Sequence, residues 1–289
     1  MSDEHIEDSA APLIEHLAEL RTRLIRSVLA FVVAMVACFT VASPVLSFIQ
    51  QPLLNVLIAR GQSPELIFTA PQEQFFVLVR ISVMGGFALS FPVIAHQLWR
   101  FVAPGLYKSE QTAFLPFIIA SPALFLLGAS FAHFVVTPLA MNFFIGFADA
   151  IPILTSYITG AEPPALSESS TELRTVFLGS IRESTDLALK FIFAFGLCFQ
   201  LPVLLTLMGK AGLISSEGLI NVRKWAVVGI LVLAALVTPP DVVTQLILFV
   251  VVYGLYEISI QLVRWVEYSR DARLRAEGLL DDEDEEDAK

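Results

Sequence analysis

The most constraining feature of this sequence is a series of long apolar runs separated by polar segments. A helix needs about 20 apolar residues to cross a hydrocarbon core about 30 Å thick. Several runs approach this length, and only 16% of the 289 residues are charged, whereas soluble domains carry about 25%. Because unpaired backbone groups are costly in lipid, these runs predict an all-α integral membrane protein.

Six runs are predicted to be transmembrane helices, and together they form one membrane domain over residues 24–263. They cover residues 24–42, 75–98, 114–136, 187–208, 225–237 and 242–263. The segments 43–74 and 138–186 are predicted to be loops, the second with short surface helices.

The two ends of the chain are predicted to lie outside the membrane. Residues 1–23 form the N-terminal segment. Residues 1–12 are predicted to be flexible, and residues 13–23 are predicted to form an amphipathic helix, because leucines recur in them at helical spacing. No cleavable signal precedes the first apolar run, so this run is expected to remain as an anchor. Residues 264–289 end in an acidic block that repels itself, which predicts a disordered tail.

Basic residues lie on alternate sides of the predicted helices. They precede helix one, separate helices two and three and helices four and five, and follow helix six. Short loops that face the cytosol are enriched in Lys and Arg. The pattern therefore predicts that both termini are cytosolic.

The fifth predicted helix is short. About fourteen residues separate Lys224 from Pro239, which corresponds to roughly 21 Å of helix. The turn Thr238-Pro239-Pro240-Asp241 leads directly into helix six. A hairpin this short must thin the bilayer, tilt little or pack inside a larger assembly. Alternatively, the helix is longer than it appears and its predicted end is wrong by a few residues.

Three polar residues lie at or near membrane depth. Gln200 has either a structural role, as an inter-helix hydrogen bond, or a functional role, and the sequence does not favour one over the other. Glu257 is expected to be protonated, paired or directed at a polar groove, and a functional or assembly role is favoured. Asp241 precedes helix six and fits an N-cap, so a structural role suffices for it.

Several functional classes have no visible basis in the sequence. Cys38 and Cys198 lie in apolar runs and read as packing residues, without a disulfide or metal site. No hydrolase, nucleotide-binding or dinucleotide-binding motif occurs, so neither enzymatic activity nor a cofactor is expected. The acidic balance, a net charge of −10, argues against nucleic acid as a partner.

Paired carboxylates stand out on the predicted cytosolic face. Glu15 and Glu19 are one helical turn apart, and Glu110 follows Tyr107 and Lys108 in the loop before helix three. Ordinary surface charge explains them, and composition alone favours that explanation. The functional alternative is a surface that binds a basic peptide, because carboxylates accept bidentate bonds from guanidinium groups.

Three motifs at these positions resemble one family. Residues 16–24, His-Leu-Ala-Glu-Leu-Arg-Thr-Arg-Leu, resemble the HLxELRxRL signature of TatC, the multispanning subunit of the twin-arginine protein translocase. Residues 91–110 resemble its FPxxxxQxWxFxxPGLYxxE stretch, and Thr238-Pro-Pro-Asp241 resembles a third motif. The motifs occur in the expected order, and the resemblance extends over nearly the whole chain.

The resemblance implies a cup-like protein of six helices in the bacterial cytoplasmic (inner) membrane, with short helices five and six. It implies a receptor that binds signal peptides with two adjacent arginines and, with TatA and TatB, exports folded precursor proteins using the proton-motive force. It also implies self-association in a multi-copy complex. The matching residues for signal-peptide binding are Glu19, Arg21, Phe101, Pro104 and Glu110, and Pro52 matches a proline of the first external loop.

One position departs from the family pattern. Several members carry a glutamate just before a proline on helix four, where this chain has Gln200. An amide forms hydrogen bonds but does not titrate, which puts a proton-carrying role at this position in doubt. Two other functional classes are alternatives: a small-solute transporter needs paired intramembrane charges or repeats, which are sparse here, and a membrane-embedded enzyme needs a clustered catalytic site, which is not visible.

Overall fold

The computed structural model of the protein describes residues 4–102, 115–147, 178–239 and 241–276. These residues are mostly helical, and six helices are long and apolar enough to span a membrane. The predicted all-α membrane fold is therefore confirmed. The six span candidates are Leu17–Thr40, Ala42–Ala59, Glu73–Leu98, Ile119–Phe147, Ile181–Lys210 and Val242–Ala272.

The first two helices correct two predictions. Helix α1 runs without interruption over Glu4–Thr40, so the lead before residue 13 is helical from Glu4. Helix α2, Ala42–Ala59, occupies the first half of the segment predicted to be a loop. It forms because apolar residues recur at helical spacing and become buried, which outweighs the effect of Pro52 within the helix. This buried face includes Ala42, Leu46, Ile49, Leu53 and Val56.

The middle of the chain contains longer helices than predicted. Helix α3 covers Glu73–Val102, and α4, Leu115–Phe131, continues through a π-helical turn, η3, Ala132–Val136, to Phe147. The long loop predicted from residue 138 is therefore helical at its start. Residues 148–177 lie outside the described residues.

The predicted fourth helix is two helices in the structure. Helix α6, Ile181–Cys198, and helix α7, Leu201–Lys210, are separated by a break at Phe199–Gln200. Helix α6 also begins six residues earlier than predicted (187 to 181), which shortens the preceding loop further.

The last helices form an unequal hairpin. After the short helix α8, Ser216–Asn221, helix α9 spans only the 15 residues Arg223–Val237, as its short apolar run predicts. Helix α10, Val242–Ala276, is 35 residues long, so the prediction of a short sixth helix is wrong. Residues 264–276 also extend this helix instead of belonging to a disordered tail, because they contain neither proline nor glycine and include good helix formers. Residues 277–289 lie outside the described residues.

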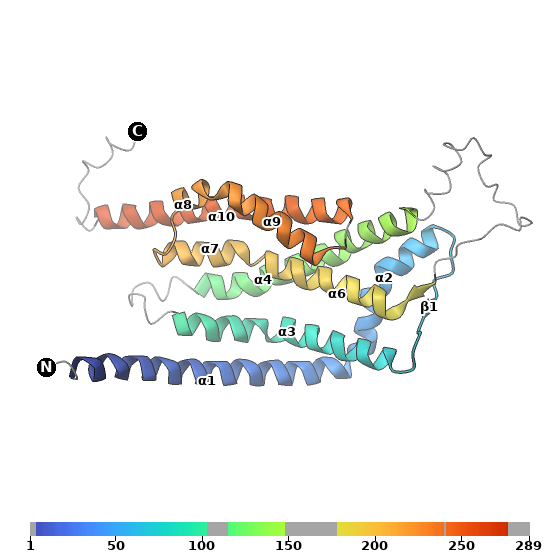
Figure 1. Cartoon of the computed structure of the whole chain (residues 1–289), viewed down its shortest axis with the longest axis horizontal. Coiled ribbons are helices and arrows are strands. Elements are labelled where there is room, and N and C mark those ends of the chain that lie inside the picture. Colours follow the sequence, from blue (N-terminus) through green and yellow to red (C-terminus); the bar gives the residue numbers. More distant parts are fainter. Residues whose placement is uncertain (1–3, 103–114, 148–177, 240, 277–289) are drawn as a thin grey trace, which may run out of the picture.

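The helices are arranged along one axis, with α2 crossing one end (Figure 1). Helices α1, α3, α4, α6–α7, α9 and α10 run along this axis in Figure 1, whereas α2 turns across the bundle. We call the end where α1 begins and α10 ends the terminal end. The opposite, cap end contains α2, the start of α3 and α6, and a parallel pair of two-residue strands, β1 (Leu66–Ile67) and β2 (Gly179–Ser180).

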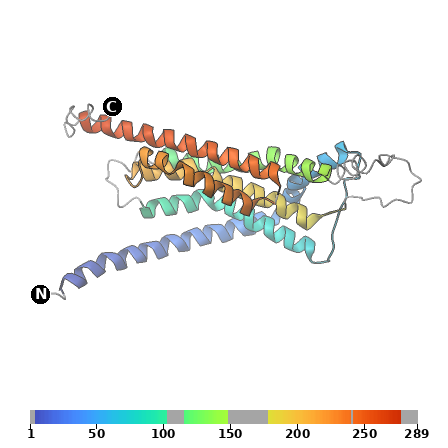
Figure 2. The same cartoon turned by 45° about the horizontal axis from the view of Figure 1, so that its top comes forward.

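The main core lies between α4–η3, α6 and α10. Phe191 and Phe195 of α6 are fully buried there together with Val136, Val252 and Ile260. Helix α1 contributes little to this core, since only 6% of its membrane-span window is buried. Figure 2 shows that its N-terminal part diverges from the other helices. Helix α1 is thus a peripheral helix held mainly by α3.

Helices α1 and α3 approach each other closely at a glycine pair. A Cβ atom added to Gly86 would lie 2.6 Å from the backbone Cα of Met35, and one added to Gly85 would lie 3.1 Å from Sγ of Cys38. Small residues at such contacts allow membrane helices to pack by close van der Waals contact. Gly254 in α10, by comparison, has no atom within 4 Å of the added Cβ.

We predict that Gly86→Ala destabilises the protein by about 1–3 kcal/mol, because the new methyl group meets rigid backbone. The matched variant Gly254→Ala is expected to be neutral or to stabilise by up to about 1 kcal/mol, as for Gly-to-Ala changes in helices. Unfolding in mixed detergent micelles, followed by circular dichroism, measures both. Equal stability of the two variants would contradict the close α1–α3 contact.

Candidate functional site

Glu19 lies on α1 toward the terminal end and forms an ion pair with Arg23, one turn along the same helix. Nε of Arg23 donates to Oε1 of Glu19 at 3.0 Å, and Nη2 contacts the same oxygen. Arg21 on the same turn is exposed. A shallow hollow of about 390 Å³ opens beside the pair and is lined by Ala18, Glu19, Thr22, Arg23 and Arg26. A carboxylate is therefore presented at an accessible surface with arginines around it.

The other predicted signal-binding residues are only partly placed. Phe101 lies in the last turn of α3, and its side chain is not among those that the structure describes. Pro104 and Glu110 fall in residues 103–114, outside the described residues. The described part of α3 ends on the side of the molecule that faces the terminal end, on which α1 begins (Figure 1).

Gln200 joins two helices through a pair of hydrogen bonds. Ser121 of α4 donates its hydroxyl to Oε1 of Gln200 at 2.6 Å, and Nε2 of Gln200 donates to the Ser121 carbonyl at 2.9 Å. Gln200 stands at the break between α6 and α7, where Pro202 follows. Both ends of the amide are thus satisfied within the chain, which is the inter-helix bond that one of the two sequence readings describes.

Glu257 is paired, which is one of the three states that its position predicts. Nη2 of Arg223 donates to Oε2 of Glu257 at 2.7 Å, and the Tyr253 hydroxyl donates to Oε1 at 2.8 Å. Arg223 is the first residue of α9 and Glu257 lies in α10. The ion pair therefore fixes the start of the short helix to its neighbour.

The predicted turn residues have structural contacts. Asp241 is buried and precedes α10, and its Oδ1 accepts the Thr244 amide at 2.7 Å, as in an N-cap. The carbonyl of Pro239 accepts the Asp241 amide at 2.6 Å, while Pro240 lies outside the described residues. Pro52 is buried inside α2 and is not in a loop as predicted.

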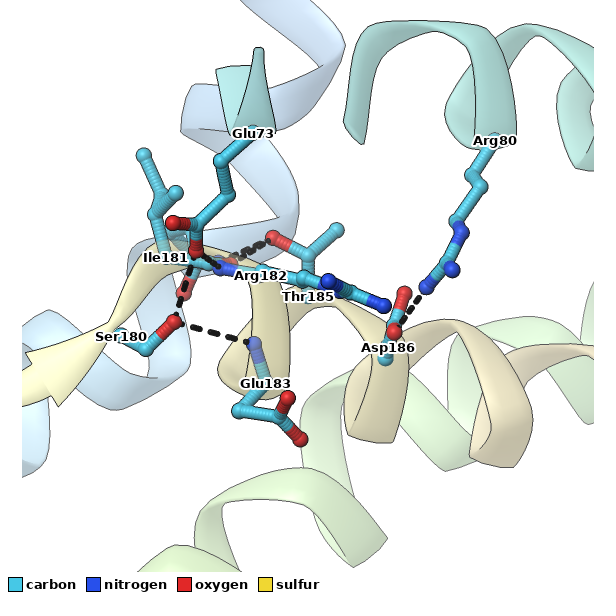
Figure 3. A network of polar contacts seen from close by, with 9 residues as sticks. Glu73, Arg80, Ser180, Ile181, Arg182, Glu183, Thr185 and Asp186 are labelled. Carbon is cyan, nitrogen blue, oxygen red and sulfur yellow. Dashed lines mark hydrogen bonds and ion pairs between the residues drawn. The ribbon is translucent and has the colours of Figure 1, made fainter. Parts of the chain in front are cut away.

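A polar network at the cap end was not predicted from the sequence (Figure 3). Glu73, the first residue of α3, is only 4% exposed and has no cationic partner among the described residues. Its Oε2 accepts the Thr69 amide at 2.6 Å, and its Oε1 accepts the Ser180 hydroxyl at 2.8 Å and the Arg182 amide at 3.2 Å. One carboxylate thus joins the segment before α3 to the start of α6. The available sequence signal was an acidic residue just before the predicted start of the helix, where the helix dipole favours a negative charge.

Two further contacts hold the cap end together. Arg80 of α3 forms an ion pair with Asp186 of α6 (Figure 3). Nε2 of Gln50 in α2 donates to Oγ1 of Thr185 at 2.6 Å. Arg80 within a predicted apolar run was the available signal for the ion pair, but Asp186 lies at the end of the segment predicted to be a loop, and sequence spacing could not identify the two as partners.

The polar contacts divide into two groups. At the cap end and at membrane depth, the polar side chains bind one another, so they fix helix positions. At the terminal end, Glu19, Arg21 and Arg26 lie at least partly at the surface. Among the described residues, no group of three or more His, Cys, Asp or Glu could hold a metal ion. The accessible polar surface at the terminal end is thus a charged one, formed by side chains such as Glu19, Arg21 and Arg26.

Comparisons with known proteins agree on one family. The profile described as "Sec-independent protein translocase protein (TatC)" matches residues 15–250. A TatC protein of Magnetococcus marinus is 38% identical over 284 residues, which cover 96% of this chain and 95% of the relative. One from Aquifex aeolicus is 37% identical over 249 residues, covering 86% and 93%. A crystal structure described as the twin arginine translocase receptor TatC has a TM-score of 0.68 and 36% identity, and the match covers 87% of this chain and 99% of that one.

The hydrogen bonds between Ser121 and Gln200 should make the effects of mutating these two residues on the free energy of unfolding non-additive. In a double-mutant cycle of Ser121→Ala and Gln200→Leu, we expect a coupling energy of about 0.5–1.7 kcal/mol, the range for hydrogen bonds between membrane helices. Unfolding free energies of the four proteins in micelles measure it. Additive effects of the two changes would show that the pair does not join α4 to α6–α7.

Proposed function

The chain belongs to the TatC family of Sec-independent protein translocase proteins, and we propose that it is the receptor core of a twin-arginine translocase. In this role it binds twin-arginine signal peptides at its cytosolic face and, with single-span TatA and TatB subunits, exports folded precursor proteins. The driving force is the proton-motive force across the bacterial cytoplasmic (inner) membrane. The chain itself acts in transport and not as an enzyme.

One observation carries the proposal: the carboxylate of Glu19 is presented beside an accessible hollow at the terminal end. Guanidinium groups form short, bidentate bonds with carboxylates. An incoming signal arginine can therefore take over contacts that Arg23 makes with Glu19 in the structure. Glu110 is proposed to supply the second carboxylate, and Arg21, Phe101 and Pro104 to complete the surface, because each matches the family motif at its position.

The distribution of basic residues supports a cytosolic terminal end. The described basic residues of α1, and those near the end of α7, the start of α9 and the end of α10, belong to this end of the bundle. They are Arg21, Arg23, Arg26, Lys210, Arg223, Lys224, Arg264, Arg270 and Arg275. Cytosolic flanks of membrane helices are enriched in Lys and Arg. We therefore place both termini in the cytosol and the cap end on the outer side.

The short helix α9 supports assembly with other membrane helices. Its 15 residues extend over roughly 22 Å, which is less than the hydrocarbon thickness of about 30 Å. Trp225, Val228 and Val232 recur on one exposed flank of α9. Packing of a TatA, TatB or second receptor helix against this flank would cover it and reduce the mismatch with the bilayer.

Gln200 is not expected to carry protons in a transport step driven by the proton-motive force. An amide does not exchange protons in the range of a proton gradient, and both ends of this amide are already bonded to Ser121. Any step that couples transport to proton movement must therefore use groups other than Gln200, in this chain or in its partner subunits.

Photo-crosslinking tests the receptor role. Thr22 is exposed, lines the hollow beside Glu19 and occupies a variable position of the family signature, so it can carry a photoreactive residue. In membranes, we expect cross-links to a precursor with an Arg-Arg signal and a large decrease with Lys-Lys. Glu19→Gln is expected to weaken docking of the Arg-Arg precursor by about ten- to 150-fold, the effect of one charge-assisted hydrogen bond of about 1.5–3 kcal/mol.

Glu217→Gln provides the matched control. Glu217 is an exposed acidic residue in α8, outside the hollow beside Glu19, and its replacement should leave the cross-links unchanged. Equal cross-linking of Arg-Arg and Lys-Lys precursors, or an equal effect of Glu217→Gln and Glu19→Gln, would count against recognition at Glu19.

A further inference from the structure

An apolar groove lies on the flank of the bundle, distinct from the hollow at Glu19. It has a volume of about 490 Å³ and is formed by α3, α6–α7 and α9. Its apolar lining includes Met84, Phe193, Leu197, Leu201, Leu233 and Leu236. A volume of this size is typical of sites for small ligands, about 300–1,000 Å³.

The short hairpin explains why the groove is open. Helix α9 ends at Val237 and α10 begins at Val242, and their connection lies well short of the cap end reached by α3 and α6 (Figure 1). The cap-side parts of α3 and α6 therefore extend past the end of α9 without being covered by it. The groove runs from this uncovered surface to the last turn of α9.

One charged residue, Lys190, lines the groove. It is exposed, and its ammonium group forms no hydrogen bond or ion pair with the described parts of the chain. It lies nine residues after Ile181, the start of α6, or roughly 13 Å along the helix axis. A lysine at this depth extends its stem along apolar surface and directs its charge toward the interface.

The neighbouring charges leave a positive excess. Arg80 and Asp186 form an ion pair one turn nearer the cap end, since Met84 follows Arg80 and Lys190 follows Asp186 by four residues. Arg182 and Glu183, both exposed, add one charge of each sign. The positive charge of Lys190, at the entrance of the apolar groove, is therefore not balanced by a negative charge among these neighbours.

We propose that this groove is a binding site for an anionic phospholipid. The headgroup phosphate contacts the ammonium group of Lys190, and an acyl chain lies along Phe193, Leu197 and Leu236. The combination of one cation with an apolar groove matches a molecule that has an anionic head and an apolar chain. The bound lipid would fill the surface that the short hairpin leaves uncovered.

Native mass spectrometry of the full chain in detergent tests the site, with phosphatidylglycerol as the anionic probe and phosphatidylcholine as the neutral one. We expect Lys190→Gln to weaken phosphatidylglycerol binding about fivefold, the effect of one basic residue at a membrane surface. Phosphatidylcholine has the same phosphate, but its choline cation offsets the charge, so its binding should change much less, and Lys190→Arg should retain the parent affinity. Ala194→Phe, which places a ring in the groove, should weaken binding of both lipids.

Lys224→Gln is the matched control, since Lys224 is an exposed lysine at the other end of α9 and should not affect this site. Parent-like phosphatidylglycerol binding by Lys190→Gln, or parent-like binding of both lipids by Ala194→Phe, would overturn the proposal.

A photoreactive residue in place of Ala194 should form lipid adducts in native membranes. Adducts with a protein instead would assign the groove to a partner helix. Circular dichroism and gel filtration identify any variant that fails to fold; its data are replaced by those of Ala194→Leu or Lys190→Met.

Discussion

The hydrocarbon core of a membrane offers no hydrogen-bond partners, and this constraint determines most of the structure. Polar side chains at membrane depth must find partners within the protein or reach water. Ser121 and Gln200 satisfy each other across α4 and the α6–α7 break, and Arg223 with Tyr253 satisfies Glu257 between α9 and α10. Each pair fixes which helices are neighbours. The apolar core around Phe191 and Phe195 adds packing, but lipid tails are themselves apolar, so the polar pairs and the close glycine contacts specify the arrangement.

The same constraint separates the two ends of the bundle by function. At the cap end, the Glu73 carboxylate is buried and bonded to the segments around Thr69, Ser180 and Arg182, so this end is held together internally. At the terminal end, α1 diverges from the bundle and presents Glu19 with exposed basic residues near it. A rigid cap and an accessible charged end are what a receptor requires if it holds its shape in the bilayer while a peptide exchanges at one face. The short helix α9 forms a third region, beside which the proposed lipid and the proposed partner helices would pack.

Sequence reasoning predicted the helical membrane fold and the short helix α9, which the structure confirms; the residues of the proposed binding surface, which come from the motif around Glu19, remain a prediction. Sequence reasoning could do so because apolar run length and the motif around Glu19 are local signals. It missed α2 and predicted a loop there, because the buried face of that helix is interrupted by polar residues and Pro52, and its burial depends on packing against α3 and α6. It missed the Glu73 network and the Arg80–Asp186 pair for a related reason. Their partners are about 106 to 109 residues apart in sequence, and no local pattern identifies which polar groups meet.

The proposed receptor role requires that the charged terminal end faces the cytosol and that the cap end faces outward. Labelling of single cysteines with a membrane-impermeant maleimide tests this orientation most directly, in a chain whose Cys38 and Cys198 are replaced. Ser63, in the exposed segment before α3, and Ser269, on the exposed extension of α10, are suitable positions. In intact cells, the account predicts that Ser63→Cys is labelled and that Ser269→Cys is labelled only after the membrane is opened. Labelling of Ser269→Cys in intact cells with protection of Ser63→Cys would contradict it.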